Sequence, residues 1–256
     1  MEFVSIEEAR KASGLRLVVS GYNWAGWSEC AKQLMYAKGI DHLYVEQIPY
    51  SENAELVAWT GVRNQPQAIW NDEPVRSSWL DILNLAERIK PEPRLLPEDS
   101  DERALVVGVS NELCGEQGLA WCRRVQLGSM PTLYKDRDTI MMRDYGAKYG
   151  GDVSWDEQRM AQIVDALGKR LRAQEKAGSR YLVGRAFSAA DLYWAVLSNL
   201  FNPMDADVCP MRPALRAQFA DPTAAVAKLL DPILLEHREY IYRTYLRLPM
   251  DFDYAE

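Results

Sequence analysis

The chain has 256 residues, of which 48% are hydrophobic and 26% are charged, values typical of a globular protein long enough to bury a sizeable core. Its formal net charge of −7 and its lack of any lysine or arginine block argue against a nucleic-acid partner or an anionic membrane surface. No apolar run approaches the ~18 residues that a membrane-spanning helix needs. The N-terminus lacks the apolar centre of a signal peptide, so we expect a cytoplasmic protein.

Cysteine and histidine are scarce and scattered. The four cysteines show no metal-ligand spacing, so we expect reduced thiols that mostly pack as small hydrophobic side chains. They are Cys30, Cys114, Cys122 and Cys209. With only His42 and His237 present, a histidine-rich metal site is excluded, and a Ser-His-Asp triad has almost nothing to be built from. We therefore predict no metal.

Apolar periodicity and turn residues predict an opening half in which strands alternate with helices. Ser5 and Glu8 have the spacing of a helical capping box, and Gly39 and Gly61 are placed to end helices. In chain order we expect a helix over 6–13, a strand over 15–20, a helix over 29–38, a strand over 42–48, a helix over 53–60, a strand over 64–70, a brief return strand at 75–76 and a helix over 77–88.

A proline-rich stretch separates this half from the rest of the chain. Three prolines fall within residues 90–99, which cannot form a regular element. Beyond it the pattern is helical, over 101–126, 156–177, 188–201, 212–219 and 222–244. We predict a small α/β domain over 1–88, a proline-rich linker over 89–100 and an all-helical domain over 101–256.

Three motifs stand out along the chain. They are Tyr36-Ala-Lys-Gly-Ile40 at the end of a predicted helix, Asn64-Gln65-Pro66-Gln-Ala-Ile followed by Ser77-Ser78, and Tyr181-Leu-Val-Gly-Arg-Ala-Phe-Ser188-Ala-Ala-Asp191. In the last, Ser188 and Asp191 have the spacing of a capping box for a buried helix. With the order of elements, these motifs make the chain resemble an atypical member of the soluble glutathione transferase family. The resemblance implies a thioredoxin-like N-terminal domain, a C-terminal helical bundle, glutathione as co-substrate and a homodimer.

The resemblance also implies where glutathione binds. A cis peptide bond at Gln65–Pro66 would present a strand edge to the cysteinyl part of glutathione. Ser77 and Ser78, at a helix N-terminus, would receive the γ-glutamyl carboxylate. Ser78 matches the serine of the family, whereas Ser77 stands where the family often has Glu or Gln. Asp81 or Glu73 would have to compensate for that missing acceptor.

The loop Ser20-Gly-Tyr-Asn-Trp-Ala-Gly-Trp-Ser-Glu-Cys30 is where the family activates the glutathione thiol. One hydrogen bond to the thiolate, of ~1.5–3 kcal/mol, would lower the thiol pKa by one to two units. The position of the family's catalytic serine or cysteine falls on Ala25-Gly26, which has no side-chain donor. We therefore name Tyr22 and Ser28 as candidate catalytic residues. The alternatives are packing against the linker for Tyr22 and N-capping for Ser28.

Other residues of this loop have two interpretations each. Trp24 and Trp27 would wall the pocket beside glutathione or would pack between the domains. Cys30 would be either a thiol of lowered pKa in the first helical turn or a buried inert one, which we favour. Glu29 and Lys32 would touch glutathione or, as we favour, form a solvent-exposed pair.

We predict a glutathione-dependent transferase that attacks a small apolar electrophile held between the domains. Trp121, Arg124 and Tyr145 of the helical domain are the candidate substrate residues, with core packing as the alternative for Trp121. A lyase or isomerase would use the same site. A non-catalytic binding or assembly module and a Cys30-based thiol transferase are the competing functions.

Overall fold

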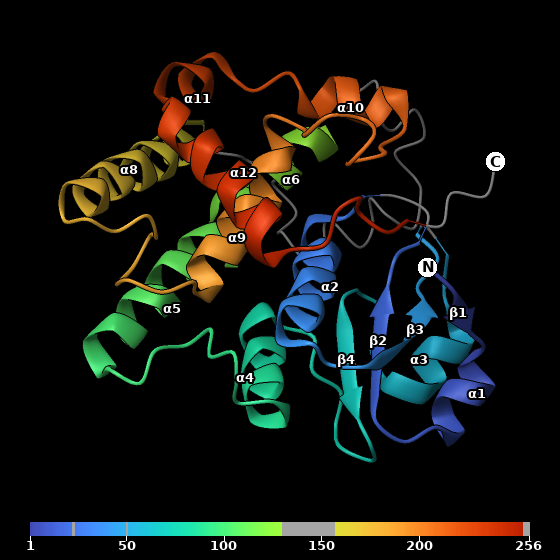
Figure 1. Ribbon diagram of the computed structural model, residues 1–256. Coiled ribbons are helices and arrows are strands. Elements are labelled where there is room, and N and C mark those ends of the chain that lie inside the picture. Colours follow the sequence, from blue (N-terminus) through green and yellow to red (C-terminus); the bar gives the residue numbers. More distant parts are fainter. Residues whose placement is uncertain (22–23, 50, 130–156, 253–256) are drawn as a thin grey trace.

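The computed structural model describes residues 1–21, 24–49, 51–129 and 157–252 (Figure 1). Strands and helices alternate in the first half, which contains β1 (Phe3–Val4), α1 (Ile6–Lys11), β2 (Leu15–Val19), α2 (Gly26–Lys38), β3 (His42–Glu46), α3 (Ala54–Thr60), β4 (Gln67–Trp70) and α4 (Trp79–Ile89). The described part of the second half is helical and contains α5 (Ser100–Cys114), α6 (Leu119–Ser129), α8 (Glu157–Lys176), α9 (Ala189–Leu197), the 3₁₀ helix η1 (Ser198–Leu200), α10 (Pro213–Phe219), α11 (Ala224–Leu229) and α12 (Pro232–Tyr245).

The strands form one sheet in the order β1-β3-β2-β4. β2 pairs in parallel with β3, with Val18 opposite Val45, and antiparallel with β4, with Leu17 opposite Ala68. β1 adds to the outer edge of β3 in parallel, with Phe3 opposite Tyr44. The sheet therefore combines parallel strands with one antiparallel strand, as the thioredoxin-like prediction requires.

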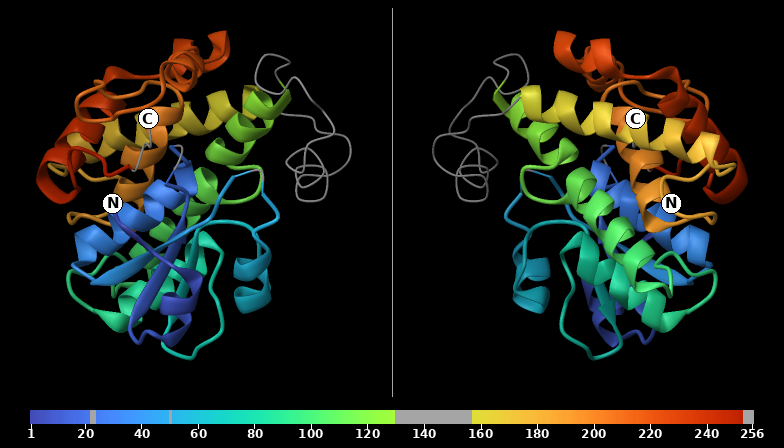
Figure 2. Two further views of the ribbon diagram at one scale, coloured as in Figure 1. Left: turned by 90° about the vertical axis from the view of Figure 1, so that its right-hand side faces the viewer. Right: turned by 90° about the vertical axis from the view of Figure 1, so that its left-hand side faces the viewer.

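The two faces of the sheet carry different cores. Val18 of β2 packs with α1, α3 and β3 on one face, whereas Leu15, Leu17 and Val19 belong to the larger core on the other face. Figure 1 shows α1 and α3 on the first side, and α2 and α4 between the sheet and the helical half. α8, yellow in Figure 2, lies at the end of the molecule away from the sheet. The larger core thus runs from the sheet through α2 into the helical half.

Several predicted boundaries were wrong. α2 begins at Gly26, three residues before the predicted start, and β1 was not predicted. The predicted helix over 101–126 is α5 and α6, separated by a turn in which Gln117 has a φ of 58°. The predicted helix over 222–244 is α11 and α12, because Pro232 starts a new helix behind its N-cap Asp231. In the two split helices the chain breaks although the apolar pattern continues across the break.

The Lys38-Gly39-Ile40 motif joins α2 to the stretch that follows α4. Gly39 adopts the left-handed conformation, with φ 57° and ψ 45°, and ends α2. The Lys38 side chain is fully buried and donates to the Glu87 carboxylate at 2.6 Å and to the Pro93 carbonyl at 2.7 Å. Glu87 also accepts a hydrogen bond from the Leu95 backbone N–H. This network fixes residues 90–99, which form no helix or strand.

The Ser188–Asp191 capping box is confirmed at the start of α9, a helix buried along its whole length. One Asp191 oxygen accepts from the Ser188 backbone N–H at 2.9 Å and from its hydroxyl at 2.7 Å. The other accepts from the Leu182 N–H at 2.7 Å and from His237 of α12 at 2.9 Å. The motif therefore holds the centre of the helical half together.

Candidate functional site

The candidate site lies at one edge of the sheet, where β2 and β3 end and β4 begins. Because β2 and β3 are parallel, their carboxyl ends meet at this edge, and the antiparallel β4 starts there. The backbone N–H of Gln47, just after β3, donates to the carbonyl of Val19 at the end of β2, at 2.9 Å. α2 starts after the loop that follows β2. The sheet thus brings residues 20–21, 24–28, 47 and 64–67 to one place.

The segment before β4 has the predicted conformation at proline. The Gln65–Pro66 peptide bond is cis, and Pro66 is buried while Gln65 is half-buried. The Gln67 side-chain amide donates to the carbonyls of Val62 at 2.9 Å and of Asn64 at 2.7 Å. These bonds fix the loop so that the backbone of Gln65 lies at the edge of the sheet.

Buried polar atoms without partners gather at this edge. In proteins most buried polar groups are hydrogen-bonded, so such a group needs an explanation. Among the described residues, no hydrogen-bond partner is found for Ser20 Oγ, Trp24 Nε1, Ser28 Oγ, Gln47 Oε1, Asn64 Oδ1, Gln65 Oε1 and Gln67 Oε1. All of these residues belong to the segments that end β2 and β3 or begin α2 and β4. The edge therefore offers both donors and acceptors to a polar ligand.

The N-terminus of α2 points at the same edge without a side-chain cap. Ala25 is the N-cap residue and makes no capping hydrogen bond through its side chain. The N–H groups of the first turn have no carbonyl further back in the helix to bond, and the helix dipole makes this end positive. An anion such as a thiolate is stabilised at such a position.

Ser28, a predicted catalytic residue, lies in the first turn of α2. The alternative that it caps the helix was wrong, because the cap falls on Ala25. Its side chain is 1% exposed, and its hydroxyl has no partner among the described residues. Tyr22, the other predicted catalytic residue, lies outside the described residues.

Trp24 and Trp27 both contact the helical half. Trp24 is 3% exposed and packs edge-to-face on Phe219, with ring centroids 5.4 Å apart. The indole N–H of Trp27 donates to the carbonyl of Cys114, at the end of α5, at 2.9 Å. Packing between the two halves, one of the two interpretations, is therefore present for both tryptophans. Together they clamp the start of α2 against α5 and α10.

Ser78 is the N-cap of α4, as one of the two serines was predicted to be. Its hydroxyl accepts from the backbone N–H of Asp81 at 3.1 Å and donates to the Asp81 carboxylate at 2.7 Å. Ser77 is half-buried beside it. Glu73, proposed to replace the missing acceptor, is instead held by Arg76 at 3.0 Å and Arg88 at 2.5 Å. Asp81 is thus the carboxylate at this end of α4.

Sequence comparison and structure comparison give different results. No protein-family model and no curated protein sequence matches the chain. A glutathione S-transferase structure from Pseudomonas fluorescens Pf-5 matches with a TM-score of 0.60 and 15% identity, covering 93% of this chain and 100% of the other. One from Xanthobacter autotrophicus Py2 matches with a TM-score of 0.57 and 17% identity, covering 92% and 96%. Ure2p in complex with glutathione matches with a TM-score of 0.56 and 13% identity, covering 88% and 98%.

The chain has the glutathione transferase fold. The thioredoxin-like first half and the helical second half were both expected, and the structures that match cover nearly the whole of the chain. Within the described residues no helix is both long and apolar enough to cross a membrane. That part of the chain also holds no group of three or more His, Cys, Asp or Glu side chains placed to bind a metal ion.

The four cysteines of this glutathione transferase fold are all buried, and none of them forms a disulfide bond. Burial, together with the neighbouring Cys114 thiol, raises the pKa of Cys30 well above its ordinary value. Burial also raises the pKa of Cys209 to about 12. Because the thiolate is the reactive form of cysteine, neither residue suits thiol-transfer chemistry at neutral pH.

Two of the three predicted substrate residues lie on α6. Trp121 and Arg124 are half-buried and three residues apart, so they share one face of the helix. Tyr145 lies outside the described residues. The neighbouring Arg123 is fully buried, and it donates to the carbonyl of Leu200 at 3.0 Å and to Gln126 at 2.7 Å. Arg123 therefore joins elements of the helical half.

The sequence did not predict two features of the site, namely a buried ion pair on α2 and the polar side chains of Gln47 and Asn64 at the sheet edge. Glu29 and Lys32 are an ion pair at 2.6 Å that is 1% and 5% exposed, so the expected solvent-exposed pair was wrong. The ammonium of Lys32 also donates to the carbonyl of Asp251 at 2.6 Å, under a C-terminal segment remote in sequence. Gln47 and Asn64 carry unpartnered atoms at the sheet edge but belong to no motif. Only strand pairing brings them there.

Proposed function

We propose that this chain is a glutathione-dependent enzyme of the transferase type that binds glutathione at the sheet edge. The supporting observation is the set of buried, unpartnered polar atoms at this edge, including those of Ser20, Ser28, Asn64 and Gln65. Each such group costs about 1–3 kcal/mol if it stays unpaired. A peptide-like ligand with donors and acceptors along its length would satisfy several of them. Glutathione, which the Ure2p structure contains, is such a ligand.

The parts of the site match the parts of glutathione. The Gln65–Pro66 edge would bind the cysteinyl backbone, and Ser77, Ser78 and the positive end of α4 would bind the γ-glutamyl carboxylate. Trp24 and Trp27 would contribute by holding the start of α2 beside the sulfur. The Asp81 carboxylate would provide the acceptor for the γ-glutamyl ammonium that Ser77 does not.

The thiol of glutathione would ionise at the start of α2. A free thiol has a pKa of about 8.5, so stabilisation of ~1.4 kcal/mol per pKa unit must come from the protein. The N–H groups of the first turn, the hydroxyl of Ser28 and that of Tyr22 are the groups we propose for this role. The electrophile would be a small apolar molecule held by the helical half, with Trp121, Arg124 and Tyr145 as its binding residues. We further propose a cytoplasmic homodimer.

One observation favours a second function, that of a non-catalytic glutathione-binding or assembly module. Ala25 occupies the N-cap of α2, so the helix end that we propose for the thiol has no donor from its N-cap side chain. A lyase or isomerase would need the same thiolate as a transferase. The state of the bound thiol therefore separates the enzyme from the module.

Binding and ionisation are tested in sequence. We expect millimolar glutathione to raise the melting temperature, and the ultraviolet absorbance of the bound thiolate to titrate at least one pH unit below that of free glutathione. The analogue with alanine in place of cysteine is the blank. Glutathione binding without a lowered thiol pKa would contradict the enzyme and support the non-catalytic module. Absence of glutathione binding would contradict the enzyme and would leave only a module for assembly.

A matched pair of variants locates the γ-glutamyl subsite. Ser78→Ala and Ser5→Ala each remove an N-cap hydroxyl, the first from α4 and the second from the remote α1. Each should cost about 1 kcal/mol of stability. We expect only Ser78→Ala to weaken glutathione binding, by about tenfold. Equal affinities in the two variants would place the carboxylate elsewhere.

A further inference from the structure

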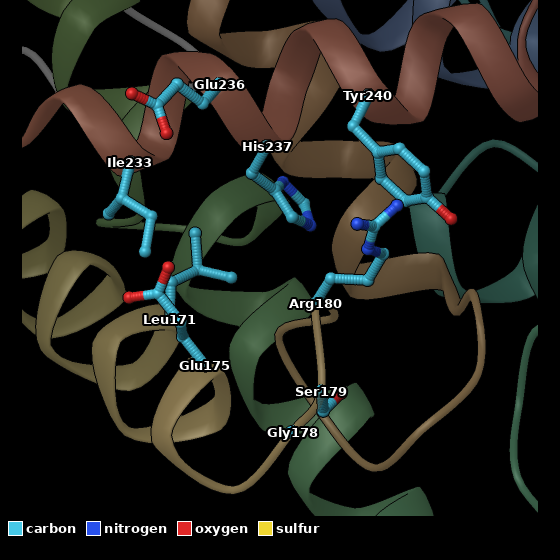
Figure 3. A pocket seen from close by; sticks show the side chains of 9 residues that line it. All are labelled: Leu171, Glu175, Gly178, Ser179, Arg180, Ile233, Glu236, His237 and Tyr240. Carbon is cyan, nitrogen blue, oxygen red and sulfur yellow. The ribbon is translucent and has the colours of Figure 1, made fainter.

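A pocket of about 380 Å³ opens in the helical half, remote from the sheet edge (Figure 3). It lies between the end of α8, the turn that follows it and α12. It is lined by Leu171, Glu175, Gly178, Ser179, Arg180, Ile233, Glu236, His237 and Tyr240. Pockets that bind small organic molecules usually measure ~300–1,000 Å³, so this one is large enough for an amino-acid-sized ligand.

The pocket has an apolar floor and a charged rim. Leu171, Ile233 and His237 are buried, whereas Glu175, Glu236 and Arg180 are exposed. Figure 3 shows Glu175 and Glu236 toward one end, Arg180 beside Tyr240 toward the other, and His237 between them. Opposite charges therefore stand at opposite ends of an apolar surface.

His237 supplies a buried polar atom that lacks a partner. Its Nε2 lies 2.9 Å from a carboxylate oxygen of Asp191, which also accepts from the Leu182 N–H. Because a carboxylate accepts, Nε2 carries the proton and Nδ1 of the neutral ring is an acceptor. Nδ1 is buried and has no hydrogen-bond partner in the described part of the chain. A donor on a ligand, directly or through a water, would satisfy it.

The positive end of the pocket is held in place by aromatic side chains. The Arg180 guanidinium lies 4.3 Å from the centroid of the Tyr240 ring. The Tyr240 hydroxyl lies 3.2 Å from that of Tyr181, which is 2.6 Å from that of Tyr245. At the other end, Glu175 is 3.5 Å from Arg172 outside the pocket. Glu236 stands beside it without an ion pair among the described residues.

We propose that this pocket binds a small zwitterion of the α-amino-acid type with an apolar side chain. Its ammonium group would lie between Glu175 and Glu236, and its carboxylate would bind Arg180, the side chain suited to bidentate carboxylate recognition. The apolar side chain would cover Leu171 and Ile233. A simple amine would meet Arg180 and a simple anion would meet two carboxylates, so a zwitterion fits the charges best. This site is independent of glutathione binding.

The two histidines of the chain allow a direct test. With ¹⁵N-histidine labelling, NMR should show ring signals from His42 and His237 only, and a His42→Asn variant assigns them. We expect L-phenylalanine at millimolar concentration to shift the His237 signals and leave those of His42 unchanged. 2-Phenylethylamine lacks the carboxylate and N-acetyl-L-phenylalanine lacks the ammonium. Both should bind at least tenfold more weakly.

Variants at the two ends provide the control. Arg180→Gln and Glu236→Gln change exposed side chains and should each weaken phenylalanine binding at least fivefold, whereas Glu116→Gln, exposed outside the pocket, should not. The proposal is overturned if phenylalanine leaves His237 unshifted or shifts both histidines alike. It is equally overturned if the three probes bind with the same affinity, or if the rim variants bind like the control.

Discussion

Gly26, at the start of α2, lies directly against Leu197, at the end of α9. A Cβ on Gly26 would come within 2.9 Å of Leu197 Cδ2 and 3.6 Å of the Trp24 ring. The first turn of α2, where we propose that the thiolate forms, is therefore packed on the central helix of the second half. Any side chain at residue 26 would have to displace the Leu197 side chain or the turn itself.

Gly26→Ala should destabilise the protein and weaken glutathione binding. The added methyl group must displace Leu197 or the start of α2, which costs about 1–3 kcal/mol for an overpacked core. Gly108→Ala is the matched control, because a Cβ there meets nothing within 4 Å inside α5. Gly108→Ala should increase the free energy of unfolding by about 0.5–1 kcal/mol. Urea denaturation of both variants checks the pair, and equal stabilities would contradict the packing argument.

Ser28→Ala tests whether the Ser28 hydroxyl stabilises the thiolate or has only a structural role. The Ser28 hydroxyl is buried and has no partner among the described residues, so its removal should leave the free energy of unfolding unchanged or slightly increased. If it donates to the sulfur, the pKa of bound glutathione should rise by about one unit, from loss of a ~1.5 kcal/mol hydrogen bond. Thiolate absorbance against pH gives the answer. An unchanged thiol pKa would leave the role to Tyr22 or to the helix backbone.

Lys38→Met should be strongly destabilising. The ammonium is fully buried against Glu87, and its loss leaves that carboxylate, 14% exposed, without its charge partner. Breaking a buried pair in this way costs about 3–5 kcal/mol. The ion pair of Lys11 and Glu7 provides the control, because these side chains are 73% and 79% exposed, respectively. Lys11→Met should not change the denaturation midpoint measurably. A midpoint for Lys38→Met within error of this control would refute the prediction.

His42 should make the folded state sensitive to acid. Burial lowers its pKa below the ordinary 6.5, and its Nδ1 already donates to the Ile40 carbonyl at 2.9 Å. The unfolded chain therefore binds a proton at a higher pH than the folded chain does. The contribution to stability is complete above pH 6.5 and is lost as the pH falls through the folded pKa. NMR titration should give a midpoint below 6.5, and His42→Asn should remove this part of the pH dependence of unfolding.

The fold could be predicted because its signals are local. The αL glycine after Lys38 and the Ser188–Asp191 capping box each depend on residues only a few positions apart, and the structure contains both. The break between α5 and α6 could not be predicted, because the apolar pattern continues through it. β1 was missed for a related reason, since a strand of Phe3 and Val4 exists only through its pairing with β3.

The site was only partly predictable. The family resemblance implied the cis bond at Gln65–Pro66, and the helix pattern predicted Ser77 or Ser78 as the N-cap; the structure has the cis bond, and Ser78 is the cap. The burial of Glu29 and Lys32 was not predictable, because the segment that covers them lies more than 200 residues away, with Lys32 bonded to Asp251 across 219 positions. The amphipathic pattern of a helix predicts which face packs on the adjacent core. It does not predict that a segment distant in sequence will cover the polar face.

The sequence alone determined the alternation of strands and helices in the first half, the helices of the second half, the proline-rich stretch between them and the absence of a side-chain donor at Ala25. Those features depend on neighbouring residues and on residue type. Tertiary structure alone decided that Ser20, Gln47, Asn64 and Gln65 share one edge, with polar atoms that have no partner in the described part of the chain. It also decided that α2 begins against Leu197. These relationships arise from strand pairing and from close packing between the halves, which bring residues together regardless of their distance along the chain.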